Sequence, residues 1–137
     1  MKTASIILLI LVSCIVSCIK VETNKPLNSN GDSELAVLMR KIYEDGQLTK
    51  AAILKDEKLG SLLNHKSILT ASATQPNKAK SELYQSFAEN YLNLIEELND
   101  PENLDNKTSY NNMVNSCINC HKSFCPGPIV RINKMKI

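Results

Sequence analysis

The chain contains little glycine, few aromatic residues, no tryptophan and no long stretch of charge of one sign. Only 4 Gly, 2 Phe and 4 Tyr occur among its 137 residues. A β-sandwich or barrel needs turn residues about every 8–12 positions, so this scarcity argues against an all-β fold. The 16 Lys and Arg nearly balance the 14 Asp and Glu. No segment concentrates positive charge, which excludes electrostatic nucleic-acid binding as the main role.

Proline is also sparse, and its positions divide the chain. The prolines are Pro26, Pro76, Pro101, Pro126 and Pro128. The first two long segments between them are rich in Leu, Ala, Lys and Glu, which favour helix. The composition therefore predicts an all-α fold.

The N-terminal residues form an apolar run behind a single positive charge. Lys2 precedes a stretch from residue 4 to residue 19 that is almost entirely apolar. Such a short run is typical of a secretory signal rather than of a membrane-spanning helix. We therefore expect the protein to be exported from the cytoplasm.

Two cysteines follow this run in a setting that resembles the bacterial lipobox. Cys14 and Cys18 are each preceded by branched apolar residues and a serine. The resemblance implies that one of them is lipidated and becomes the mature N-terminus. Cys18 leaves the longer apolar region and is the favoured site, with Cys14 as the alternative. A plain secretory signal is the remaining interpretation. A lipid anchor would place the protein on the periplasmic side of a bacterial membrane or on the outer membrane.

The sequence predicts three regions. Residues 1–17 form a lipoprotein signal peptide, and residues 18–31 a polar, flexible tether that begins at the lipidated cysteine. Residues 32–137 form the folded domain, which is long enough for one modest hydrophobic core.

Apolar residues recur three and four positions apart in four segments of this domain, as expected for amphipathic helices. The first segment begins with a cap at residues 32–33 and extends to about residue 58, although Gly46 could weaken or break it. The other three cover residues 61–73, residues 83–98 and a region from about residue 105 to just before Pro126. Short connections between them predict an antiparallel up-down-up-down four-helix bundle.

The last of these segments contains Cys117, Cys120 and His121 in the pattern Cys-x-x-Cys-His. This pattern is the attachment signature of c-type haem. The two cysteines lie three residues apart on one helical face, so two thioethers could hold one porphyrin. His121 lies four residues after Cys117, where its ring could bind the iron. One covalently attached haem c agrees with an exported protein, because such haem is attached outside the cytoplasm.

The motif lies near the end of the chain, on the last of four predicted helices. In these features, residues 32–122 resemble the class II cytochromes c, which comprise the cytochrome c′ family and its low-spin relatives. The resemblance implies a four-helix bundle with haem attached to the last helix. The segment that follows Phe124 departs from the usual family pattern and suggests a divergent branch.

Low-spin members of that family carry a methionine on the first helix as the sixth iron ligand. Met39 lies on the apolar stripe of the first predicted helix, whose start would meet the end of the last helix. The resemblance thus implies His121 and Met39 as the two iron ligands, with an empty sixth site as the alternative. Met113 lies on the helix of His121 and could not reach the far side of the iron. Met135 and His65 are weaker candidates, since a lone histidine on an apolar face is usually only hydrogen-bonded.

Three further residues are candidates for positions near the haem. Arg40 and Arg131 are the only arginines, and a guanidinium group suits the haem propionates; solvated surface charge is the alternative. Cys125 is interpreted as a thiol packed against the porphyrin edge, with intermolecular pairing or redox sensing as alternatives.

The leading functional hypothesis is a lipid-anchored, mono-haem one-electron carrier without enzymatic activity. Its expected partners are redox proteins at the membrane, and a homodimer is left open. A gas-binding haem protein with an open iron face is the second hypothesis. The third is a zinc-stabilised interaction domain that uses Cys117, Cys120, His121 and Cys125, although structural zinc sites usually join two separated ligand pairs. A redox dithiol or a structural disulfide of Cys117 and Cys120 is a further alternative.

Overall fold

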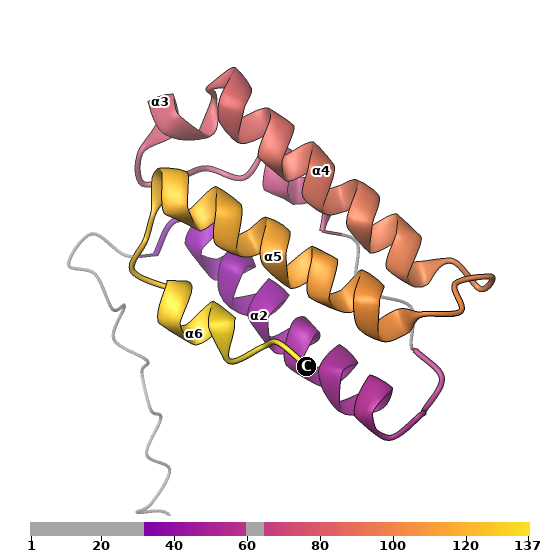
Figure 1. The fold of residues 1–137 in the computed structure, drawn as a ribbon. Coiled ribbons are helices and arrows are strands. Elements are labelled where there is room, and N and C mark those ends of the chain that lie inside the picture. Colours follow the sequence, from indigo (N-terminus) through magenta and orange to yellow (C-terminus); the bar gives the residue numbers. More distant parts are fainter. Residues whose placement is uncertain (1–31, 60–64) are drawn as a thin grey trace, which may run out of the picture. The chain divides into compact units, whose positions relative to one another are not determined.

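Three long helices and several short ones make up the part of the chain that the computed structural model describes, residues 32–59 and 65–137. The elements in chain order are α2 (Glu34–Leu54), η1 (Lys66–Leu69), α3 (Pro76–Ala79), α4 (Glu82–Asn99), α5 (Asn106–Phe124) and α6 (Ile129–Asn133) (Figure 1). The described residues include no strand, which confirms the all-α class. The predicted signal peptide, tether and lipidation sites Cys14 and Cys18 lie outside the described residues.

The long helices begin where the sequence predicts, because a capping side chain precedes each one. Ser33, Ser81 and Asp105 each accept a hydrogen bond from a backbone N–H three residues further on, at 3.2, 3.2 and 3.0 Å. These bonds satisfy donors that a helix start otherwise leaves unpaired. Helix α2 ends a few residues earlier than predicted, and Asp56, with φ of 52°, has left the right-handed helical region.

Helix α2 passes through Gly46 without a break. The hydroxyl of Tyr110 donates to the Gly46 carbonyl at 3.0 Å, and the methyl group of Met135 lies where a Cβ atom would be. A side chain at this position would therefore have to displace the Met135 methyl group, and tertiary contacts compensate for the poor helix propensity of glycine.

We expect Gly46→Leu to destabilise the domain by about 1–3 kcal/mol, the usual cost of overpacking a core. The new side chain would displace Met135 and Tyr110, although leucine itself favours helix. The free energy of unfolding from urea denaturation would measure the loss. Glu44→Leu, at an exposed position of the same helix, is the control and should stay within about 0.5 kcal/mol of the parent protein. Equal stability of the two variants would contradict the packing role.

The prediction of a second helix over residues 61–73 is wrong for the part of this range that the structure describes. Residues 61–64 lie outside the described residues, and residues 65–73 contain only the single 3-10 turn η1. Side chains of α4 bind carbonyl groups here: Tyr84 Oη donates to the Ile68 carbonyl at 3.0 Å and Gln85 Nε2 to the Leu69 carbonyl at 3.4 Å. These tertiary bonds occupy acceptors that a continuing α-helix would use. Local apolar spacing cannot reveal such competition.

The hydrophobic core lies among the three long helices. Helices α4 and α5 run antiparallel and pack along their length, and α2 runs antiparallel to α5 (Figure 1). The largest fully buried side chains are Leu98 of α4 and Tyr110 and Val114 of α5. This arrangement brings the start of α2 and the end of α5 to the same end of the domain.

The segment after α5 packs against the rest of the domain and forms hydrogen bonds with it. Helix α6 packs on α5 and buries Ile132. Lys50 Nζ donates to the carbonyls of Lys134 and Lys136, at 3.2 and 2.5 Å. The Asn111 side chain donates to the Ile137 carbonyl and accepts from its N–H. The unpredicted C-terminal segment therefore links α2 to α5.

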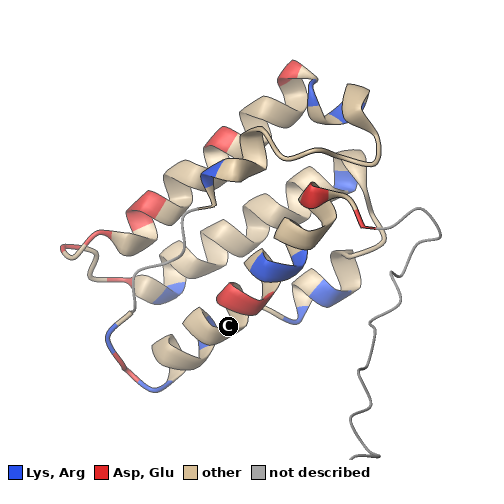
Figure 2. Ribbon diagram, turned by 180° about the vertical axis from the view of Figure 1, so that it is seen from behind, with Lys and Arg blue, Asp and Glu red and all other residues tan. Residues whose placement is uncertain are grey.

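Helix α4 and the C-terminal part of the domain carry charges of opposite sign, whereas α2 carries both (Figure 2). Helix α4 contains four glutamates and no basic residue, whereas residues 106–137 contain five basic residues and no Asp or Glu. Among the described helices, none combines the length and apolar character needed to cross a membrane.

Candidate functional site

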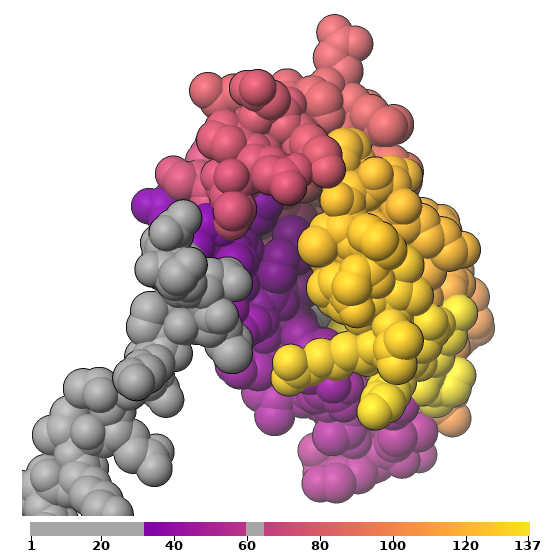
Figure 3. Space-filling model, turned by 90° about the vertical axis from the view of Figure 1, so that its left-hand side faces the viewer, coloured from indigo at the N-terminus to yellow at the C-terminus, as the bar shows by residue number. Residues whose placement is uncertain are grey.

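A pocket of about 240 Å³ lies between the start of α2, the segment around α3 and the end of α5. The space-filling view shows the hollow between these three parts of the chain (Figure 3). A second, smaller pocket of about 40 Å³ shares four lining residues with the first, which are Met39, Tyr84, Cys120 and His121. Both pockets are lined mainly by apolar side chains, as is usual for sites that bind organic cofactors.

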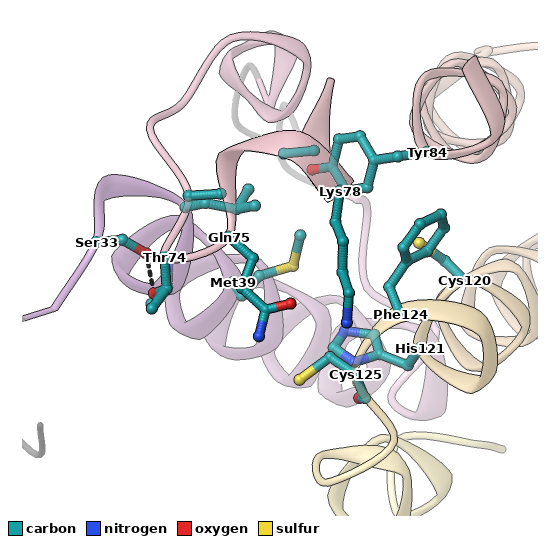
Figure 4. Close-up of a pocket in the computed structure, with 14 residues that line it drawn as sticks. Ser33, Met39, Thr74, Gln75, Lys78, Tyr84, Cys120, His121, Phe124 and Cys125 are labelled. Atoms are coloured by element: carbon teal, nitrogen blue, oxygen red, sulfur yellow. Dashed lines mark hydrogen bonds between the residues drawn. The ribbon is translucent and has the colours of Figure 1, made fainter. Parts of the chain in front are cut away.

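The structure brings together the predicted haem-binding residues. Cys120 and His121 of α5 and Met39 of α2 line the larger pocket, and Cys117 joins them in the smaller one. In the close-up, Met39 enters from α2 and His121 from the opposite wall (Figure 4). Met39 is 82 residues from His121 in the sequence, so this meeting depends on the antiparallel packing of α2 against α5.

The imidazole of His121 is held by a backbone carbonyl at the end of α5. Its Nδ1 lies 2.9 Å from the carbonyl oxygen of Cys125. A carbonyl can only accept a hydrogen bond, so Nδ1 carries the proton and Nε2 holds a lone pair. Histidines that bind metals commonly donate their other ring N–H in this way, which fixes the ring and its tautomer.

Cys117 and Cys120 are free thiols in surroundings that disfavour thiolate. Burial raises the pKa of Cys117 to about 12 and that of Cys120 to about 11, and their mutual repulsion adds to the shift of Cys117. Redox-active dithiols show the opposite, a thiol pKa lowered by nearby positive charge or a helix N-terminus. The environment therefore argues against the redox dithiol hypothesis.

Aromatic rings from α4 and α5 form one wall of the site. Phe124 meets the edges of Tyr84 and Phe87, with ring centroids 5.7 and 6.2 Å apart. Burial raises the pKa of Tyr84 to about 12, so its hydroxyl stays protonated. Sequence analysis did not assign these rings to the site. Both residues of this wall on α4 belong to the predicted helix over residues 83–98, whose apolar pattern indicates only burial.

The two arginines do not line either pocket. Arg40 forms an ion pair with Asp32 at 2.7 Å, and Arg131 lies over the ring of Tyr43, 4.2 Å from its centroid. The lysine at the larger pocket is Lys78 of α3, whose side chain extends toward the ring of His121, while Ser33, Thr74 and Gln75 line another part of the pocket (Figure 4). Lys78 was missed because it is one of fourteen lysines and belongs to a helix that the sequence did not predict.

His65 does not offer a nitrogen for metal binding. It is 3% exposed, and its ring nitrogens lie 2.7 Å from Tyr91 Oη and 2.9 Å from Asp45 Oδ2. The other two methionines considered, Met113 and Met135, are buried in the hydrophobic core and line neither pocket.

The four residues of the zinc hypothesis do not converge. In the described part of the chain, no three His, Cys, Asp or Glu side chains are grouped closely enough to hold a metal ion. Cys125 is exposed at the rim of the larger pocket. A tetrahedral zinc site needs four converging ligands, so this arrangement argues against the zinc hypothesis.

The geometry of the site is the basis for any functional assignment. Comparisons with protein-family models, curated proteins and solved structures found no significant match to this chain.

Proposed function

We propose that the domain covalently binds one c-type haem and carries single electrons. The observation that carries this proposal is the convergence of Cys120, His121 and Met39 on one apolar pocket, with Cys117 adjoining. A haem-attachment motif could occur by chance in a sequence. Its convergence with a second ligand type from a distant helix is much more specific.

The chemistry of the pocket fits a haem. Each thiol, Cys117 and Cys120, would add across one vinyl group: sulfur bonds to the inner carbon and the thiol hydrogen goes to the outer carbon. No oxidant or reductant is needed for this addition. His121 Nε2 and the Met39 thioether would hold the iron, and Lys78 would be available to pair with a propionate.

The bound haem would supply a one-electron Fe(III)/Fe(II) couple. The chain contributes a thioether ligand and an apolar pocket, and both raise the potential by disfavouring the more highly charged ferric state. The aromatic wall excludes water from the porphyrin. Two protein ligands also limit structural change during electron transfer, which suits a carrier.

We further propose that the domain is a divergent relative of the class II cytochromes c. Helices α2, α4 and α5 would correspond to the first, third and fourth helices of that bundle. The segment with η1 and α3 would replace the second. A lipid anchor at Cys18 would hold the carrier near redox proteins at the bacterial membrane.

The direct test is expression of the full chain with and without the machinery that attaches c-type haem. We expect covalent haem in the first case, seen as haem-dependent peroxidase staining on a denaturing gel. The pyridine haemochrome spectrum should show two saturated vinyl groups and one haem per chain. Protein that folds and accumulates equally in both cases, but never carries haem, would overturn the proposal.

The anchor can be tested separately. We expect Cys18→Ala to move the protein from the membrane fraction to a soluble or incompletely processed form, since lipid chains on the mature N-terminal cysteine provide stable membrane binding. Fractionation and metabolic labelling with a fatty acid would measure the change. Cys14→Ala is the matched control and should remain lipidated. The reverse pattern would assign the anchor to Cys14.

A further inference from the structure

A hydrogen-bonded chain of three ionisable side chains connects α2 to the wall of the smaller pocket. Asp45 Oδ2 lies 2.9 Å from Nε2 of His65, and Nδ1 of His65 lies 2.7 Å from Tyr91 Oη. The side chain of Asp45 is 13% exposed and that of His65 only 3%. The chain therefore runs from a residue in partial contact with water into the interior.

The partners of His65 determine which protons it holds. The Asp45 carboxylate can only accept, so Nε2–H donates to it, and Tyr91 donates its hydroxyl proton to Nδ1 of the neutral ring. A proton arriving at Nδ1 would reverse the second bond, with Tyr91 then accepting. The adjacent carboxylate would also stabilise the imidazolium.

Among the groups of this hydrogen-bonded chain, the His65 imidazole is the proton acceptor. The charged and titratable groups around it support this role. Asp45 faces it from α2 and Tyr91 from α4, while Lys66 is its neighbour on η1. Burial, then Cys117 and Asp45, raise the pKa of Tyr91 well above its usual range, so this phenol remains protonated. Tyr84, the other phenol packed on this turn, donates to the Ile68 carbonyl.

Tyr91 brings this chain to the site. Its side chain lines the smaller pocket together with Met39, Cys117 and His121. Charge added to this pocket would act on the His65 ring that is bonded to Tyr91, because the interior screens charges weakly.

We propose that His65 is a redox-linked proton acceptor. This inference rests on the proposed haem function. When the haem in the pocket gains one electron from a donor protein, His65 takes up one proton from water at Nδ1 and becomes imidazolium. Oxidation releases the same proton. The net charge of the interior is thus unchanged by each electron transferred, which reduces the cost of placing charge in an apolar site.

The proposal predicts a midpoint potential that falls as pH rises. An added electron favours the protonated form of His65, so reduction is easier where protons are abundant. This fall in midpoint potential is the expected result. Potentiometric titration of the haem-loaded full chain at several pH values would measure it. NMR of the His65 ring should show protonation at higher pH in the reduced than in the oxidised protein.

Variants identify the group responsible. His65→Gln, which retains hydrogen-bonding capacity, should lose the pH dependence. Asp45→Asn should shift the fall to lower pH, because the imidazolium loses its carboxylate. Glu44→Gln, an exposed neighbour of Asp45 on α2, is the charge-matched control and should behave as the parent protein.

Two results would overturn the proposal: a potential independent of pH in the parent protein, or an equal pH dependence in parent and His65→Gln. If His65→Gln does not fold, the parent measurement and Asp45→Asn still decide the question. Failure to attach any haem would instead refute the proposed function, so the two failures are distinguishable.

Discussion

Replacing both Cys117 and Cys120 by alanine is expected to abolish covalent haem attachment. No thiol would then remain in the motif to form a thioether, although the polypeptide could still form its helices. Haem staining on a denaturing gel, together with the mass of the purified chain, would measure the loss. A double variant that still carried haem through the gel would refute the assignment of the motif.

The single variants and a third cysteine provide controls for this experiment. Cys117→Ala and Cys120→Ala should each leave at most one thioether and one unsaturated vinyl group, visible as a shifted pyridine haemochrome band. Cys125→Ser should retain both thioethers, because its side chain lies at the exposed rim. His121→Ala should also impair haem attachment or alter the absorption spectrum of the haem, since Nε2 of this histidine is lost.

Met39→Ala is expected to convert a six-coordinate iron into one with an open position. The thioether enters from α2 on the wall opposite His121, and alanine cannot reach the iron (Figure 4). We expect a shift of the ferrous spectrum toward high spin, rapid carbon monoxide binding and a lower potential. Absorption spectra with and without carbon monoxide, and redox titration, would measure these effects.

A matched pair of variants separates ligation from packing. Met39→Leu preserves apolar volume but removes the sulfur, whereas Met113→Leu makes the same change in the core outside both pockets. Only Met39→Leu should leave an open coordination position on the iron of the haem-loaded protein. If the unaltered protein is already high-spin and binds carbon monoxide readily, Met39 acts in packing and the gas-binding hypothesis is favoured.

Features encoded by local pattern were predictable from the sequence. The caps and apolar stripes located α4 and α5 closely, and they located the start of α2. The Cys-x-x-Cys-His spacing singled out Cys117, Cys120 and His121, which line the smaller pocket together, and their binding of haem stays a prediction. The expected meeting of Met39 with this motif followed from antiparallel helix order, and both do line one pocket.

Features that depend on tertiary partners were not predictable. The segment of η1 has apolar spacing suited to a helix, yet Tyr84 and Gln85 of α4 bind its carbonyls. Arg40 seemed placed for a propionate, but Asp32, eight residues earlier, holds it. Lys78 lines the pocket only because of the short helix α3. In each case a distant or unpredicted neighbour decides the outcome.

The two hydrogen bonds donated by Lys50 have a consequence for the order in which the helices pack during folding. They join residues 84 and 86 positions apart, whereas α4 and α5 are neighbours in sequence with a short connection. Local contacts generally form before distant ones, because closing a long loop costs more chain entropy. We therefore expect the α4–α5 hairpin to form first and α2 to dock last. In that interval the thiols on α5 would remain open on the side that α2 later covers, and a large ligand such as the proposed haem would have access before the pocket closes.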